Sequence, residues 1–141
     1  MELQNIKRVY LVGIGGIGMS GLARYFHHLG CIVCGYDKTS TDLTNELHNE
    51  GIQVIFDDNE EWIPMSFRKT DEGTLVIYTP AIPKDSAIVG FFQKRGFELF
   101  KRSQVLGLIS KGKYTVAIAG THGKTTTSIF TRIFQYMGNH G

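Results

Sequence analysis

Apolar runs recur along this chain at an almost constant interval, which limits the folds that it can adopt. The runs begin near residues 9, 31, 53, 74, 97 and 114, so successive starts are 22, 22, 21, 23 and 17 residues apart. Most of the intervening segments have helical periodicity; residues 41–50 and 86–95, for example, carry their apolar side chains on one face. Strands that alternate with helices in this way predict an α/β fold with a parallel sheet, right-handed crossovers and helices on both faces.

A glycine-rich loop follows the first apolar run. Residues 9–12 form that run, Gly13-Ile14-Gly15-Gly16-Ile17-Gly18 comes next, and apolar residues then recur at helical spacing up to Gly30. In a strand, loop and helix of this kind, the glycines permit a tight turn and let a diphosphate approach the backbone closely. We therefore predict a Rossmann-like nucleotide site at this loop.

Asp37 is the candidate ribose ligand of the predicted site. It lies nineteen residues after Gly18 and just past the apolar run 31–34, where a Rossmann-like fold places an acid that accepts a hydrogen bond from a ribose hydroxyl. A cap of a turn or helix is the alternative role for this residue. The acid suits NAD, but it suits equally any nucleotide whose ribose reaches the second strand.

A second glycine-rich loop lies further along the chain. The apolar residues 116–119 predict a short strand before it, and a helix is expected from Thr125 onward. The loop N–H groups would surround a nucleotide phosphate, Lys124 would reach the β- and γ-phosphates, and the Thr125 hydroxyl would coordinate Mg²⁺. The candidate catalytic residues are Lys124 and Thr125, and the candidate ATP-binding residues are Gly120, Thr121, His122, Gly123, Lys124, Thr125 and Thr126. The spacing departs from the common G-x-x-x-x-G-K-[ST] pattern, and an ordinary glycine-rich turn is the alternative.

Composition and charge set bounds without choosing a function. With 141 residues, of which 42% are hydrophobic, the chain can bury one good core and little more. A formal net charge of +2 gives no reason to expect nucleic acid or a membrane as partner. Glu2 in place of a basic leader, and the lack of an apolar run of about 20 residues, predict a soluble, cytoplasmic protein without a signal peptide.

Two further local patterns concern the cysteines and a polar joint. Cys31 and Cys34 spell C-x-x-C, but an odd separation along a strand points the two side chains to opposite faces, which favours packing over metal or redox chemistry. Residues 110–113 form a short polar joint after an apolar helical segment. We therefore predict two domains: a Rossmann-like domain over residues 1–110, and the beginning of another over residues 111–141.

Five motifs in order along the chain resemble the amino-terminal part of bacterial Mur ligases. They are Gly13–Ser20, Gly35–Asp37, Tyr78–Ile82, Lys101–Ser103 and Ala119–Thr127. The resemblance covers essentially the whole chain, and a G-x-G-G-x-G-M loop combined with a T-H-G-K-T-T-T loop is specific. Within the family, it is strongest to the members that join L-alanine to UDP-N-acetylmuramate.

The resemblance implies an ATP- and Mg²⁺-dependent ligase of peptidoglycan precursor synthesis, and hence a role in the cell wall, cell shape and cell division. Such an enzyme phosphorylates the lactyl carboxylate of UDP-N-acetylmuramate, and the amine of L-alanine then displaces phosphate from the acyl phosphate. Residues 1–110 would bind the UDP moiety. Residues 111–141 would supply the first strand, P-loop and helix of a truncated central ATPase domain, so this chain alone would be inactive.

The resemblance also implies a set of residues that contact the UDP-substrate. They are Gly13, Gly15, Gly16, Ile17, Gly18, Met19, Ser20, Asp37, Thr79, Pro80, Ala81 and Ile82. Lys101 and Arg102 would either meet the diphosphate or be solvated. His122 would contact a phosphate or the sugar acid, or pack within its loop.

Other classes remain open on the sequence alone. An NAD-dependent Rossmann oxidoreductase would use Gly13–Gly18 and Asp37 but would leave Lys124 and Thr125 without a role. A binding module without catalysis would simply hold a UDP-sugar. A sibling ligase would add a preformed peptide to the same sugar acid. The oligomeric state is open as well.

Overall fold

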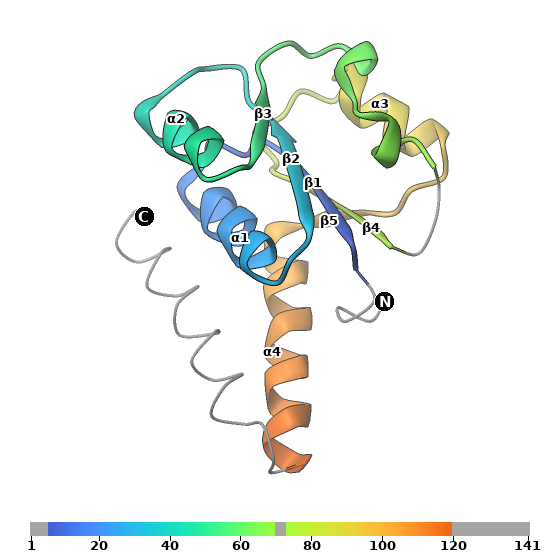
Figure 1. Ribbon diagram of the computed structural model, residues 1–141. Helices are drawn as coiled ribbons and strands as arrows, with labels where there is room; N and C mark the ends of the chain where they lie inside the picture. Colours follow the sequence, from blue (N-terminus) through green and yellow to red (C-terminus); the bar gives the residue numbers. More distant parts are fainter. Residues whose placement is uncertain (1–5, 70–72, 120–141) are drawn as a thin grey trace.

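A five-stranded parallel sheet forms the centre of the molecule (Figure 1). The computed structural model describes residues 6–69 and 73–119. The strands are β1 (Arg8–Val12), β2 (Ile32–Tyr36), β3 (Gln53–Ile55), β4 (Thr74–Tyr78) and β5 (Leu99–Lys101), in the spatial order β3-β2-β1-β4-β5. All four neighbouring pairs are parallel, as the alternation of strands and helices predicted.

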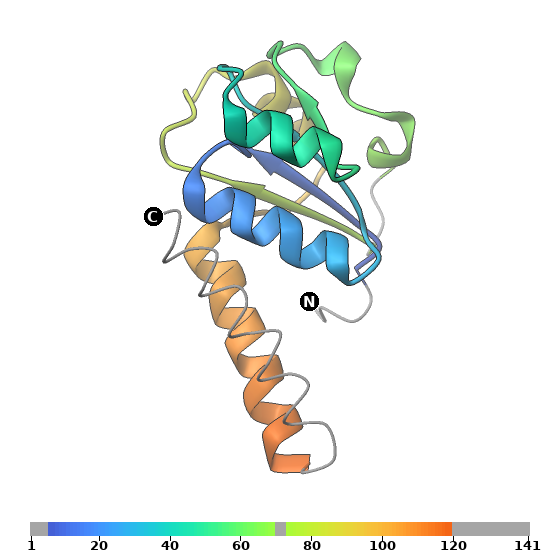
Figure 2. The same ribbon diagram turned by 60° about the vertical axis from the view of Figure 1, so that its left-hand side comes forward.

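Helices cover both faces of the sheet (Figure 2). Side chains of α1 (Ile17–His28), α2 (Asp42–Asn49) and α4 (Arg102–Ala119) pack with those of β1 and β4 in one hydrophobic cluster. A second cluster joins the opposite face to α3 (Ala87–Lys94) and the 3₁₀ turn η3 (Met65–Phe67), which follows the turn η2 (Glu60–Trp62). Both predicted features, an α/β fold and helices on both faces, are confirmed. In the described part of the chain, no helix is long and apolar enough to cross a membrane.

The prediction of a strand at residues 116–119, as the first strand of a second domain, is wrong in this structure. Residues 116–119 are the last turn of α4, which also runs without a break through the predicted polar joint at 110–113. A short apolar run does not by itself distinguish a strand from a helix. A helix satisfies its backbone groups internally, whereas a strand needs a neighbour. The second glycine-rich loop and its helix lie outside the described residues, and the domain boundary at residue 110 stays a prediction.

The two cysteines lie on opposite faces of the sheet, as their separation predicted. Cys31 belongs to the cluster with α1, and Cys34 belongs to the cluster with α3. Burial raises the pKa of the Cys34 thiol to about 12, and it also raises the pKa of Cys31. Because the thiolate is the reactive form, both side chains act as small apolar groups of the core.

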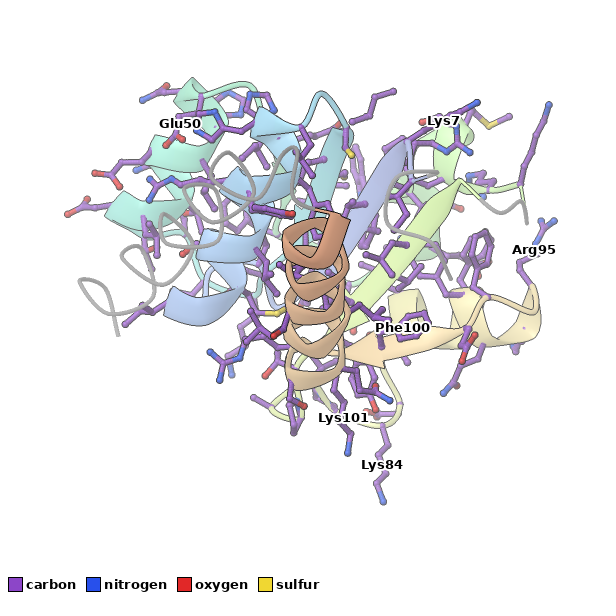
Figure 3. All side chains as sticks on the ribbon, turned by 90° about the horizontal axis from the view of Figure 1, so that it is seen from below. Lys7, Glu50, Lys84, Arg95, Phe100 and Lys101 are labelled. Carbon is purple, nitrogen blue, oxygen red and sulfur yellow. The ribbon has the colours of Figure 1, made fainter. Side chains whose placement is uncertain are left out.

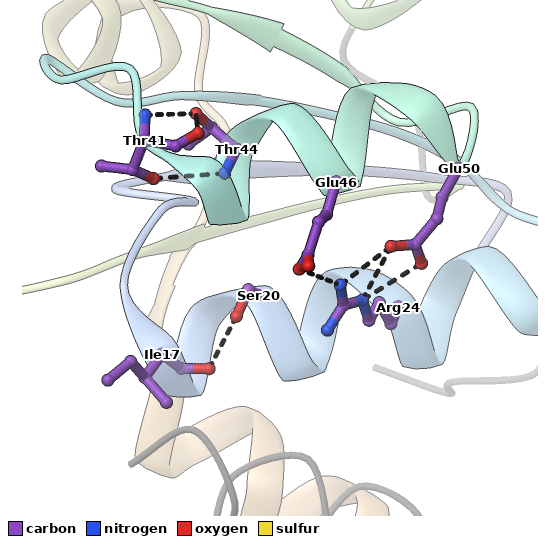
Figure 4. A network of polar contacts seen from close by, with 7 residues as sticks. All are labelled: Ile17, Ser20, Arg24, Thr41, Thr44, Glu46 and Glu50. Atoms are coloured by element: carbon purple, nitrogen blue, oxygen red, sulfur yellow. Dashed lines mark hydrogen bonds and ion pairs between the residues drawn. The ribbon is translucent and has the colours of Figure 1, made fainter.

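An ion-pair cluster around Arg24 joins α1 to α2 (Figure 4). The Arg24 guanidinium is nearly buried, and its Nη2 lies 2.8 Å from Glu50 Oε2 and 3.2 Å from Glu46 Oε2. Its Nε also donates to both Glu50 oxygens at 3.1 Å. The two glutamates are four residues apart and therefore share one face of α2. One guanidinium thus fixes α2, and with it the loop that joins β2 to α2.

The start of α2 is fixed by a reciprocal cap, also visible in Figure 4. The Thr41 side chain accepts a hydrogen bond from the Thr44 N–H at 3.2 Å, and the Thr44 hydroxyl accepts one from the Thr41 N–H at 2.8 Å. Two N–H groups that a helix start leaves unpaired are satisfied in this way. Residues 37–41, which border the site described below, are therefore anchored at their far end.

Tyr10 carries an unpaired hydroxyl into the core. Its ring is fully buried, with centroids 5.6 Å from Phe67 and 5.0 Å from Phe92. Among the described residues, the Tyr10 hydroxyl has no hydrogen-bond partner, and burial, with smaller effects of Cys34 and Asp58, raises its pKa above the ordinary value.

An unpaired buried hydroxyl costs about 1–3 kcal/mol. We therefore expect Tyr10→Phe, which removes only the oxygen, to raise the free energy of unfolding by about 1 kcal/mol in urea denaturation. Tyr25→Phe, at a tyrosine that is only partly buried, is the matched control. A Tyr10→Phe protein less stable than the wild type would show that the hydroxyl has a partner in solution.

Candidate functional site

The carboxyl ends of β1, β2 and β4 meet at one edge of the sheet, because the strands are parallel and adjacent. The loops after these strands, together with Asp58 after β3, enclose a pocket of about 410 Å³. Its lining residues are Gly13, Gly16, Met19, Tyr36, Asp37, Lys38, Thr39, Asp58, Thr79, Ala81, Ile82 and Pro83. In sheets of this type, ligands bind at this edge, where the strand order reverses.

The glycine-rich loop is held against β2 by backbone hydrogen bonds. The N–H groups of Gly13 and Ile14 donate to the Tyr36 carbonyl at 2.7 and 2.9 Å. Gly13 has φ +96°, a conformation that favours glycine, and a Cβ there would overlap the Thr79 side chain. The first glycine of the motif is therefore required both by the turn and by the close approach of the loop after β4.

The amino end of α1 opens toward this loop without a side-chain cap. Its N-cap residue is Gly16, and the first turn contains no acid. The Ser20 N–H donates to the Gly16 carbonyl at 2.8 Å, so the N–H groups of residues 17–19 precede the first helical hydrogen bond. Unpaired amides and the helix dipole together make this end of α1 attractive to an anion.

Asp37 bonds to the loop itself. Its Oδ2 accepts from the Gly15 N–H at 2.9 Å, and its Oδ1 accepts from the Thr39 N–H at 3.1 Å. This is the geometry of the alternative role, a cap of a turn. A carboxylate has about four acceptor positions, so a ribose hydroxyl could still bind to Asp37. Its part in ligand binding therefore stays a prediction.

Carboxylates gather at the end of the pocket that β2 and β3 form. Asp58 accepts from the Ser86 hydroxyl at 2.9 Å and from the Ile88 N–H at 3.0 Å, which fixes it at the start of α3. Burial raises the pKa of the nearby Tyr36 hydroxyl, and the charges of Asp58 and Asp37 add to that shift. This end of the pocket therefore offers carboxylate acceptors beside the side chain of Lys38, whereas the α1 end offers N–H donors.

The structure brings seven of the twelve residues that were predicted to contact the UDP-substrate to the pocket. Gly13, Gly16, Met19, Asp37, Thr79, Ala81 and Ile82 line it. The buried Ser20 hydroxyl donates to the Ile17 carbonyl at 2.8 Å within α1 (Figure 4) and is occupied there. Pro80 faces a different pocket. The predicted residues 120–126, with Lys124 and Thr125, lie outside the described residues.

Sequence reasoning missed five residues that line the pocket. They are Tyr36, Lys38, Thr39, Asp58 and Pro83. Tyr36, Lys38 and Thr39 surround Asp37 at the end of β2, and their position directly after an apolar run was the available signal. Asp58 gave only a turn signal, because nothing in the sequence shows that the end of β3 reaches the loop after β1.

A second pocket, of about 720 Å³, lies on the other side of the loop after β4. It shares Ile82 and Pro83 with the first pocket and is lined further by residues of α3 and β5. Lys84 and Lys101 border it, and Figure 3 shows both side chains extending on the same side of the molecule. Lys101 thus faces this second pocket, whereas Arg102, the next residue, packs on Gly18.

Residues 8–114 match the model of the Mur ligase family, catalytic domain. Because this match spans most of the sequence, the chain belongs to the Mur ligase family. Within the family it is similar to UDP-N-acetylmuramate–L-alanine ligases: it is 50% identical to that of Christiangramia forsetii and 56% identical to that of Cytophaga hutchinsonii. These matches cover 90% and 91% of this chain, but only 28% and 27% of the two relatives.

A solved structure gives the same relationship. The chain matches the UDP-N-acetylmuramate-alanine ligase of Thermotoga maritima with a TM-score of 0.61 and 27% identity, over 75% of this chain and 23% of that one. The chain therefore spans about a quarter of the length of the relatives that it matches. The family and the fold are established by these likenesses, while the activity of a whole ligase belongs to the proposal below.

Proposed function

We propose that this chain binds the UDP moiety of UDP-N-acetylmuramate as part of a ligase that adds L-alanine to that sugar acid. The observation that carries the proposal is the division of the 410 Å³ pocket into two ends of opposite character. The uncapped amino end of α1 offers N–H donors, which suit a diphosphate. Asp37 and Asp58 offer acceptors, which suit ribose hydroxyls and the N–H of uracil.

In this proposal the diphosphate lies on residues 13–18, and the uridine extends toward the ends of β2 and β3. Met19 would contact the ligand beside the loop, and Thr79, Ala81 and Ile82 would close the pocket from the β4 side. Pro80 and Ser20 are supported less well, because one faces the second pocket and the other is occupied within α1. Their proposed role is to shape the loops.

The ATP-dependent step would use the second glycine-rich loop. From the sequence, Lys124 would neutralise charge on the β- and γ-phosphates, Thr125 would hold Mg²⁺, and Gly120–Thr126 would surround the phosphates. The proposed domains are residues 1–110 for the UDP-substrate and residues 111–141 for the start of the ATP-binding domain. L-alanine and ATP are proposed partners of the whole enzyme, and a cytoplasmic location belongs to the same proposal.

Calorimetric titration with UDP, UDP-N-acetylmuramate, NAD and uridine tests the binding proposal. We expect UDP and UDP-N-acetylmuramate to bind with similar affinity, uridine to bind much more weakly, and NAD not to bind. Binding of NAD without UDP would favour an oxidoreductase and contradict the proposal. The sibling ligase uses the same sugar nucleotide, so that alternative is judged instead from the relatives, which are named L-alanine ligases at 50% and 56% identity.

We expect the chain of 141 residues, purified alone, to show no ligase activity. Phosphoryl transfer needs its Mg²⁺ ligands, its phosphate loop and its acceptor aligned together, and the chain spans only 27–28% of its curated relatives. The measurement is ATP-dependent incorporation of labelled L-alanine into UDP-N-acetylmuramate, with a full-length relative as the positive control. Incorporation by the chain alone, above the background without ATP, would refute this expectation.

A further inference from the structure

Arg102 is packed onto the glycine-rich loop from a distant part of the sequence. It is the first residue of α4, and it lies directly after β5. A Cβ added to Gly18 would lie 2.9 Å from both Cδ and Cζ of Arg102 and would overlap its Nη1. The guanidinium therefore lies against the first turn of α1, in a space that only a glycine at position 18 leaves open.

The local structure at the start of α4 sets this position. The Lys101 N–H donates to the Gln104 side chain at 2.8 Å, which caps the amino end of the helix. Val105 and Ile109 are buried in the cluster that also contains Met19 and Leu22 of α1. The first residue of α4 is thus held beside the start of α1 by packing that does not involve its own side chain.

This arrangement places the positive Arg102 guanidinium beside the positive amino end of the α1 dipole. In residues 6–69 and 73–119, the Arg102 side chain makes no hydrogen bond or ion pair, and it is exposed. The first turn of α1 contains no acid. A cation at the amino end of a helix is unfavourable, because it faces the positive end of the dipole. An anion bound at that end would contact the amides and the guanidinium together and would remove this conflict.

We propose that Arg102 is a binding residue for the diphosphate. A diphosphate held by both the glycine-rich loop and the Arg102 guanidinium ties the start of α4 to that loop. This inference rests on the proposed function, and it decides between the two roles, a diphosphate contact or a solvated side chain, that the sequence left open for Arg102. The guanidinium donates two parallel hydrogen bonds to phosphate oxygens, so it fits a diphosphate better than a single charge would. Occupation of the site then stabilises α4 as well as the pocket.

The test compares Arg102→Ala with Lys101→Ala in the 141-residue chain. Lys101→Ala is the control, because it removes the same charge one residue away, at a side chain that borders the second pocket. We expect Arg102→Ala to weaken UDP binding about tenfold, and Lys101→Ala to change it less than twofold. Uridine, which lacks phosphate, is expected to bind both variants as it binds the wild type, measured by chemical-shift titration. Arg102→Lys retains charge without the planar fork, and we expect it to recover part of the affinity.

Hydrogen exchange measures a second effect, the protection of α4 amides by UDP, which a change of net charge alone would not alter. In the wild type, UDP is expected to slow exchange of the amides of residues 105–109 in α4, whereas in Arg102→Ala it is expected not to. Equal UDP affinity and equal protection in wild type and Arg102→Ala would overturn the role of Arg102 and leave the proposed function standing. No UDP binding by the wild type would overturn the proposed function itself, and this inference with it. Matching circular dichroism spectra establish that each variant is folded; if Arg102→Ala is not, Arg102→Gln takes its place in both measurements.

Discussion

Gly35→Ala is expected to lower the free energy of unfolding by roughly 2–3 kcal/mol, an effect at the upper end for one added methyl group in a packed core. Gly35 lies in β2 opposite Leu11 of β1. A Cβ at this position would lie 2.6 Å from the Leu11 carbonyl oxygen and 2.7 Å from Ile14 Cβ. Because one of these atoms belongs to the backbone of the central strand, the sheet cannot relax by moving a side chain alone.

Urea denaturation, followed by circular dichroism, measures this loss. Gly90→Ala is the matched control: it lies within α3, and a Cβ there would meet no atom within 4 Å. Since alanine favours a helix interior over glycine, this control is expected to gain about 0.5–1 kcal/mol. If the two substitutions had the same effect, the close approach of β1 and β2 seen here would not exist in solution.

Gly15→Val is expected to weaken UDP binding roughly a hundredfold, equivalent to about 2.7 kcal/mol. A Cβ at Gly15 would lie 2.8 Å from Asp37 Oδ2 and 3.1 Å from Thr44 Cγ2. A branched side chain would therefore push Asp37 away from the Gly15 N–H and shift the loop on which the diphosphate is proposed to lie. The loss combines a distorted anion site with a displaced acceptor for the ribose.

Calorimetry with UDP measures the effect, after thermal unfolding has shown that the variant is folded. Gly107→Ala serves as control, because this glycine lies in α4 and a Cβ there would have no neighbour within 4 Å. A folded Gly15→Val protein that binds UDP as tightly as the wild type would place the nucleotide elsewhere. The second pocket, with Lys84 and Lys101 at its border, would then be the next candidate.

Local features of the fold could be predicted because they depend on neighbours in sequence. Helix α3 begins after Ser86, whose side chain accepts from the Val89 N–H, and it ends before Gly96 with φ +84°. Both end signals are visible in the sequence. The predicted strand at residues 116–119 failed for the opposite reason: four apolar residues carry too little local information, and a strand forms only where a neighbour pairs with it.

The candidate site could be predicted only where one loop carries its own signature. Gly13–Gly18 is such a loop, since Gly13 is needed for the turn, and Gly15 and Gly18 leave room for Asp37 and Arg102 to pack closely. Asp37 was found by its spacing, but its hydrogen bonds to Gly15 and Thr39 were not. Asp58 gave only a turn signal, and the sequence left Arg102 between a diphosphate contact and a solvated side chain, because the positions of both residues depend on which strands are neighbours.

The sequence alone therefore determined the alternation of strands and helices, the glycine-rich loops and the family resemblance, all of which follow from periodicity and short motifs. Only the tertiary structure decided that β4 pairs with β1 across 66 residues, with Arg8 opposite Thr74. That pairing places Thr79 on Gly13, and β5 beyond it brings Arg102 to Gly18. The physical reason is that periodicity fixes how a strand or helix forms locally, whereas strand order is chosen by the burial and hydrogen bonding of the whole sheet.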